Sequence, residues 1–131
     1  MKFTRLALAA TLAAAGTGFA SSAFAQPANE QFIPLLSYRP GQFAPLGIPW
    51  ADGKQDYPKL VNAQGGINGV KIAFEECETA YDTSRGVECY ERLKSKGSGA
   101  SGFDPQSTGI TFAVTDKAPI DKVPVVTAGY G

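Results

Sequence analysis

A glycine-rich stretch over residues 62–77 joins the end of a predicted helix to a predicted strand. The two glycines at 65–66 can adopt the positive φ that ends a helix, and the Asn-Gly pair at 68–69 can make a tight reversal. After the turn, large apolar residues occupy every second position over 70–75, which is the period of a pleated strand. A helix that hands over to a strand in this way predicts an α/β layer fold.

The first 25 residues have the pattern of a cleavable signal peptide. Lys2 and Arg5 precede an apolar run over 6–15, and small residues around position 24 predict cleavage after Ala25. The alternative is a membrane anchor, but the run is too short to span a bilayer and is followed by glycines and serines. Because no cysteine lies at the cleavage site, we expect an exported, periplasmic chain over 26–131 without a lipid anchor.

Charge and cysteine content exclude several classes of function. Removal of the signal peptide leaves ten basic and twelve acidic residues, a net charge of −2. The chain therefore lacks the excess positive charge that nucleic-acid binding requires. The chain has two cysteines and no histidine, so a zinc site is not expected, and nothing indicates a cofactor or another metal. In an exported protein the even count predicts a disulfide between Cys77 and Cys89.

The rest of the chain predicts alternating strands and helices. Apolar runs predict strands over residues 32–38, 70–77, 96–104 and 123–127. The third is the weakest, because it is rich in glycine and serine. Helices are predicted over residues 48–64, over 83–96 and from 103–108 onward. This order is that of a parallel sheet with right-handed crossovers.

The helices carry more specific expectations. In the first helix, Pro58 predicts a kink or break, with Asp56 capping the second piece. Its large apolar residues predict a sheet-facing stripe of Trp50, Tyr57, Leu60 and Val61. The second helix should begin at an Asp82 N-cap and bury Val87, Tyr90 and Leu93. The third helix should bury its inward face, which carries Ile110, Ala113, Val114 and Ala118.

Three places could carry chemistry. The loop over 39–47 follows the first strand, at the position where open α/β sheets place their ligand crevice. The alternative is that this loop only connects the strand to the helix. Ser107 and Thr108 lie at the start of the third helix, where hydroxyls and free N–H groups can hold an anion, and simple capping is the alternative. The glutamates at 75, 76 and 78 resemble a carboxylate cluster, but strand alternation sends neighbours to opposite faces and favours a solvated rim.

Four segments together resemble a known family. They are IPLLSY at 33–38, GQFAPLG at 41–47, NAQGGINGVK at 62–71 and YD at 81–82. They resemble the opening of the branched-chain amino-acid-binding family, the type I periplasmic substrate-binding proteins of ABC importers. The resemblance implies an α/β fold, a parallel-sheet three-layer lobe that is incomplete at the C-terminus. Residues 26–131 would be the first part of the amino-terminal ligand-binding lobe, with the second lobe absent.

The resemblance also implies a ligand site and a partner. In that family the start of the third helix and the loop after the fourth strand hold the ligand's carboxylate. The implied ligand-binding residues are Ser107, Thr108, Gly129, Tyr130, Tyr38 and Arg39. Leu46 and Gly131 depart from the leucine-binding pattern, so the ligand is expected to be an amino acid, an amide or a related organic acid. An amide, a urea-like compound or an aromatic acid would fit the resemblance as well as a branched-chain amino acid. The implied partner is the membrane permease of an ABC importer.

Two other classes of function remain open. An exported α/β enzyme would need a general base, but the chain has no histidine and no Gly-x-Ser-x-Gly elbow. A secreted sensor lobe of the same fold would bind a ligand without coupling to a transporter. We therefore expect a solute-binding protein and not an enzyme.

Overall fold

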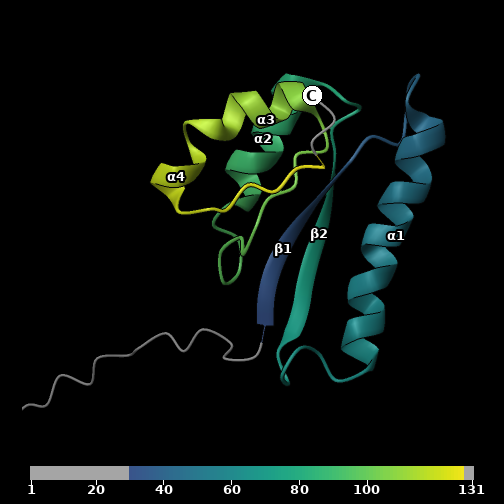
Figure 1. Ribbon diagram of the computed structural model, residues 1–131, viewed down its shortest axis with the longest axis vertical. Coiled ribbons are helices and arrows are strands. Elements are labelled where there is room, and N and C mark those ends of the chain that lie inside the picture. The colour runs from purple at the N-terminus through teal and green to yellow at the C-terminus, as the bar shows by residue number, and fades with distance from the viewer. Residues whose placement is uncertain (1–29, 129–131) are drawn as a thin grey trace, which may run out of the picture.

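The α/β arrangement is visible in the computed structural model, which describes residues 30–128 (Figure 1). In chain order the elements are β1 (Glu30–Ser37), α1 (Ala44–Ala63), β2 (Lys71–Glu78), α2 (Thr83–Leu93), α3 (Thr108–Thr115) and α4 (Ala118–Asp121). α1 lies on one side of the two strands, and α2, α3 and α4 lie on the other, so the chain forms three layers. The predicted signal peptide lies outside the described residues. Among the described helices, none is long and apolar enough to cross a membrane.

The sheet is parallel, as the order of elements predicted. β1 and β2 pair in parallel from Glu30 opposite Lys71 to Ser37 opposite Glu78. Two further segments join as single parallel bridges: Ala100 and Asp104 pair with β1, and Val125 pairs with Phe103. The predicted strands over 96–104 and 123–127 are therefore bridges and not full strands. The many small residues and turns of the first segment weaken its pairing, and the second contains Pro124, which cannot donate to the ladder.

Two predictions for α1 were wrong, namely the break at Pro58 with Asp56 as a cap and the sheet-facing stripe of large apolar residues. The helix runs without a break from Ala44 to Ala63, through both Pro49 and Pro58. Pro58 is buried, so the packing of α1 against the sheet outweighs its local preference to break the helix.

The predicted sheet-facing stripe of α1 instead faces outward. Trp50, Tyr57 and Leu60 are 40%, 66% and 54% exposed, and Val61 is only half-buried. The buried positions are Gly47, Ala51 and Pro58. A Cβ on Gly47 would lie 2.0 Å from the carbonyl oxygen of Tyr38, so large side chains do not fit between this part of α1 and the end of β1.

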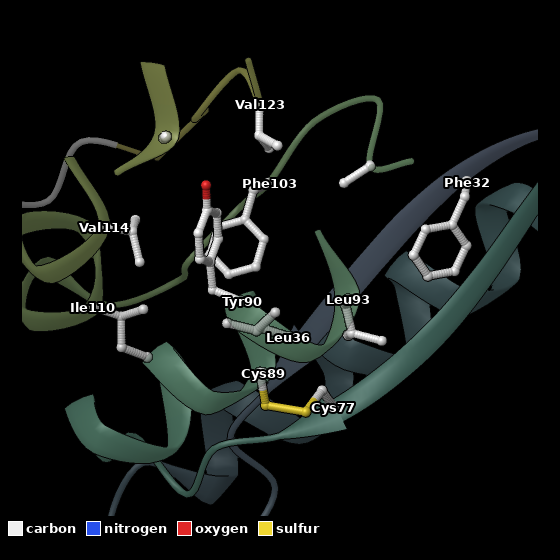
Figure 2. Close-up of a cluster of buried hydrophobic side chains, with 12 residues drawn as sticks. Phe32, Leu36, Cys77, Cys89, Tyr90, Leu93, Phe103, Ile110, Val114 and Val123 are labelled. Carbon is white, nitrogen blue, oxygen red and sulfur yellow. A yellow bond between two sulfur atoms is a disulfide. The ribbon is translucent and has the colours of Figure 1, made fainter. Parts of the chain in front are cut away.

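α2 agrees more closely with its prediction. Its N-cap is Asp82, whose side chain accepts a hydrogen bond from the Arg85 N–H at 2.9 Å. The helix ends at Leu93 instead of the predicted residue 96. Turns and bends that include Gly97 and Ser98 follow it. The predicted disulfide joins Cys89 on α2 to Cys77 near the end of β2, with 5.9 Å between their Cα atoms (Figure 2).

The core lies between the sheet and the helices α2 to α4. The rings of Tyr90 and Phe103 meet edge to face with centroids 4.9 Å apart, and Ile110 and Val114 of α3 pack beside them (Figure 2). The third predicted helix divides in two, because α3 ends at Thr115 and Ala118 is buried as the first residue of α4. Ala113 is only half-buried.

Tyr90 also links α2 to α4 through a polar contact. Its hydroxyl donates to Asp121 Oδ2 at 2.8 Å, and Lys94 Nζ donates to the same oxygen at 2.9 Å. Burial and the hydrogen bond to Asp121 raise the pKa of Tyr90 to about 12. Hydrogen bonds from Lys94 and Tyr90 hold the pKa of Asp121 below its usual range.

We expect Tyr90→Phe to lower the free energy of unfolding at pH 7 by about 1–2 kcal/mol, because it removes a hydrogen bond to a charged group. The raised pKa means that the protonated tyrosine stabilises the fold fully below about pH 10, its unfolded pKa. This contribution is lost as the pH rises towards the folded pKa of about 12. Urea unfolding at pH 7 and over pH 9–12 tests this. The prediction would be contradicted if the difference in free energy of unfolding between parent and variant stayed constant over pH 9–12.

Candidate functional site

A cavity of about 430 Å³ lies at the carboxyl ends of the parallel segments. Tyr38 follows β1, Tyr81 follows β2, Asp104 ends the third segment, and Thr127 and Ala128 end the fourth. Open α/β sheets place their ligand crevices at this edge, because the strand-to-helix loops converge there. The cavity is therefore the candidate functional site.

Ser107 and Thr108, which the resemblance assigned to one ligand site, both line this cavity. Ser107 is the N-cap of α3 and is 6% exposed; its Oγ accepts a long hydrogen bond of 3.4 Å from the Ile110 N–H. Thr108 is the first helical residue and is exposed, and within residues 30–128 its hydroxyl makes no hydrogen bond. Capping thus accounts for Ser107 but not for Thr108.

The charged group of the cavity is neutralised within the protein. Asp104 Oδ2 lies 3.0 Å from Lys54 Nζ of α1. With the Gln106 amide in the orientation that its neighbours favour, its oxygen accepts from Lys54 Nζ at 2.7 Å and from Trp50 Nε1, while its nitrogen donates to the Leu36 carbonyl at 3.2 Å. The Asp104 charge therefore presents no unpaired negative field to a ligand.

Four aromatic residues form the aromatic wall of the cavity: Tyr38, Phe43, Trp50 and Tyr81. The Tyr81 ring touches both Tyr38, with centroids 5.2 Å apart at 79°, and Phe43, with centroids 4.6 Å apart at 51°. Sequence reasoning placed only Tyr38 of these four in the site. Tyr81 could have been found from its position just after β2, at the same sheet edge as Tyr38.

The backbone around Tyr81 is held in an uncommon conformation. Ala80 and Tyr81 both have positive φ values, 51° and 62°. The Tyr81 N–H donates to Thr79 Oγ1 at 3.1 Å, and Thr79 donates through both its N–H and its hydroxyl to the Ser37 carbonyl at 2.8 Å. Left-handed non-glycine residues cost conformational energy and persist only where neighbouring bonds enforce them. The end of β1 thus positions the Tyr81 ring.

Arg39, another predicted site residue, does not line the cavity. Its guanidinium pairs with Asp52 of α1 at 2.7 Å and with Glu76 of β2 at 2.5 Å. Partial burial opposes ionisation of Glu76 and is the largest single effect, but its hydrogen bonds and the nearby positive charge of Arg39 together outweigh it, so the pKa of this carboxyl lies below its usual range. Arg39 joins α1 to β2 beside the site.

The three neighbouring glutamates do not gather into one cluster. Glu75 pairs with Arg92 and Lys96, whereas Glu76 pairs with Arg39. Glu78 accepts from the Ser37 hydroxyl at 2.8 Å and from the Arg39 N–H at 2.9 Å. Within residues 30–128, no three metal-ligating side chains come together. The expected solvated rim is instead a set of separate ion pairs and hydrogen bonds.

Gly129 and Tyr130 lie outside the described residues. Thr127 and Ala128, which directly precede them, line the cavity. The chain therefore reaches the site immediately before these two predicted residues.

Comparison with known proteins places this geometry in context. Residues 30–131 match the family described as periplasmic binding protein. A solved structure described as an ABC transporter permease from the Pseudomonas fluorescens group is 40% identical, with a TM-score of 0.74 over 79% of this chain and 26% of that one. No curated protein matches the chain significantly.

Two more distant structures share the fold. A fatty acid ABC transporter substrate-binding protein from Thermomonospora curvata is 22% identical, with a TM-score of 0.68 over 76% of this chain and 25% of that one. A branched-chain amino acid transporter substrate-binding protein from Streptococcus pneumoniae, in complex with isoleucine, is 23% identical, with a TM-score of 0.66 over 76% of this chain and 28% of that one. The present chain thus spans about a quarter of the length of these structures.

Proposed function

Because this chain belongs to the periplasmic binding protein family, we propose that it is part of the solute-binding component of an ABC importer. It captures a small polar ligand, an amino acid, an amide or a related organic acid, between this lobe and a second one. The cavity at the carboxyl edge of the sheet carries the proposal, since Ser107 and Thr108 meet the aromatic wall there.

The start of α3 suits the polar end of such a ligand. The first N–H groups of a helix have no partner within it, and the helix dipole places partial positive charge there. Thr108 adds an exposed hydroxyl without a partner among the described residues. In our proposal Ser107 and Thr108 hold a carboxylate or carbonyl, Gly129 and Tyr130 complete that end, and Tyr38 contacts the rest of the ligand.

Family membership implies an extracytoplasmic location. We propose that the first 25 residues direct export and are removed, that the protein carries no lipid anchor, and that its partner is a membrane permease. Two of the similar solved structures are described as substrate-binding proteins of transporters, which favours binding over catalysis. A chain of this length would then supply the first part of the amino-terminal lobe.

Substitution of the two hydroxyls tests the proposed site. In the full-length protein, Thr108→Ala should lower the affinity for the ligand by about tenfold to a hundredfold, because a hydrogen bond to a charged group contributes about 1.5–3 kcal/mol. Stability should barely change, because Thr108 is not the cap. Ser107→Ala should weaken binding similarly and also lower stability by about 1 kcal/mol through the lost cap.

Calorimetric titration with amino acids, amides and small organic acids, alongside melting curves, measures both effects. Thr115→Ala is the control, because Thr115 lies on the same helix but outside this cavity. It should leave affinity unchanged. If Thr108→Ala and Ser107→Ala bind as the parent does, the ligand does not use the start of α3.

A further inference from the structure

The aromatic wall keeps large ring surfaces accessible inside a cavity. Phe43 and Tyr81 are each 39% exposed, and Trp50 is similarly exposed. Leu46, one turn before Trp50 on α1, is exposed beside them and lines the same cavity. Accessible apolar rings gathered in one concavity indicate an apolar part of the ligand.

The arrangement of the rings indicates the shape of that part. Tyr81 is in direct contact with both Tyr38 and Phe43 at centroid distances of about 5 Å. A cage for a quaternary ammonium needs rings spread around a central cation, and these rings already fill the space between one another. Tyr38, Phe43 and Tyr81 present one surface, against which a further ring can pack edge to face or offset, and Trp50 lines the same cavity.

The wall is held in place before a ligand arrives. The left-handed backbone at Tyr81 is fixed by the hydrogen bond that the Tyr81 N–H donates to Thr79 Oγ1. The Trp50 indole N–H donates to the Gln106 amide, and Gln106 is itself held in a left-handed conformation with φ of 55°. A preorganised wall loses little conformational entropy on binding, so it discriminates well between ligand shapes.

The charge balance of the cavity also restricts the ligand. The Lys54 ammonium neutralises Asp104, so no unpaired acid remains among the described residues of the cavity to attract a cation. The hydroxyls of Ser107 and Thr108 lie in the same cavity as the rings. An anionic end on α3 and a ring on the aromatic wall can therefore belong to one small molecule.

We propose that the ligand is an aromatic carboxylate, with its ring on the aromatic wall and its carboxylate at the start of α3. This inference rests on the proposed function and narrows its ligand class. Each ring–ring contact strengthens binding about two- to tenfold beyond simple burial, so aromatic acids outcompete saturated acids of equal carbon number.

Matched pairs of probes test the proposal by calorimetry on the full-length protein. The pairs are benzoate with cyclohexanecarboxylate, and phenylalanine with cyclohexylalanine; choline is the cationic probe. We expect at least one aromatic member to bind about tenfold or more tightly than its saturated partner. Phe43→Leu and Trp50→Leu, which keep apolar bulk but remove a ring, should each weaken the aromatic probe about three- to tenfold and shrink the ratio.

Tyr57→Leu is the matched control, since Tyr57 is an exposed aromatic residue of α1 outside the cavity. It should leave both affinities unchanged. Equal binding of the saturated acids, binding of choline alone, or an undiminished ratio in both Phe43→Leu and Trp50→Leu would overturn the aromatic ligand. If the saturated acids bind and Thr108→Ala weakens their binding, the proposed solute-binding function stands and only the aromatic class of the ligand is wrong. If no probe binds, the aromatic class is wrong, and the wider panel of amino acids and amides decides the function separately.

Discussion

Replacing Gly47 by alanine is expected to lower the free energy of unfolding by about 3 kcal/mol, the upper end for overpacking a tight contact. The added Cβ would lie 2.0 Å from the Tyr38 carbonyl oxygen and 2.5 Å from its ring. Because the closest atom belongs to the backbone, α1 must move away from the end of β1. Tyr38 lines the candidate site, so ligand affinity should fall with stability.

Gly53→Ala is the matched control for this change. Gly53 lies on the same helix and is exposed, and a Cβ added there would meet no other atom within 4 Å. Alanine at this position should stabilise the protein by up to about 1 kcal/mol, because it is the better helix former. Urea unfolding of both variants measures the contrast. Equal shifts in the same direction would show that the contact between α1 and β1 is looser than the structure indicates.

Loss of the Cys77–Cys89 disulfide should lower the free energy of unfolding by about 2–3 kcal/mol, the scale for a loop of this length. The bridge spans 12 positions and ties α2 to the end of β2. Cys77→Ser and Cys89→Ser should have similar effects, and the parent protein under reducing conditions should behave like the double variant. Urea unfolding measures the loss.

Mass spectrometry of the unreduced exported protein tests the bridge itself. Two freely alkylated thiols in native material would contradict it. Melting that is unaffected by reductant would show instead that the bridge forms without stabilising the fold.

Local patterns in the sequence were sufficient for several elements. The alternation after Gly69 predicted β2, the apolar run before Arg39 predicted β1, and Asp82 was correctly predicted as the cap of α2. These features depend on interactions between residues close in the chain, such as a cap that bonds a backbone N–H three positions on.

The candidate site was predictable only in part. Ser107, Thr108 and Tyr38 were placed in one site, and all three line the cavity. Phe43 lies in the loop over 39–47 that was considered as a ligand crevice, but it was not named as a site residue. Trp50 was missed, because nothing local to α1 shows that its beginning reaches the loop after β2. Arg39 was drawn into the site by its position after β1, but two acidic partners from α1 and β2 hold it elsewhere.

The sequence by itself determined the α/β order, the disulfide pair and the start of α3, because each follows from short-range periodicity, capping or residue count. The parallel sheet followed from that order, since helical crossovers connect parallel strands. Only the tertiary structure decided which face of α1 is buried and where the aromatic side chains gather. Helical periodicity marks a stripe of large apolar residues, but the close approach of α1 to the Tyr38 carbonyl admits only a small residue at Gly47. The packing therefore turned Trp50 away from the core and into the cavity, where it meets Gln106, a residue that lies far from it along the chain.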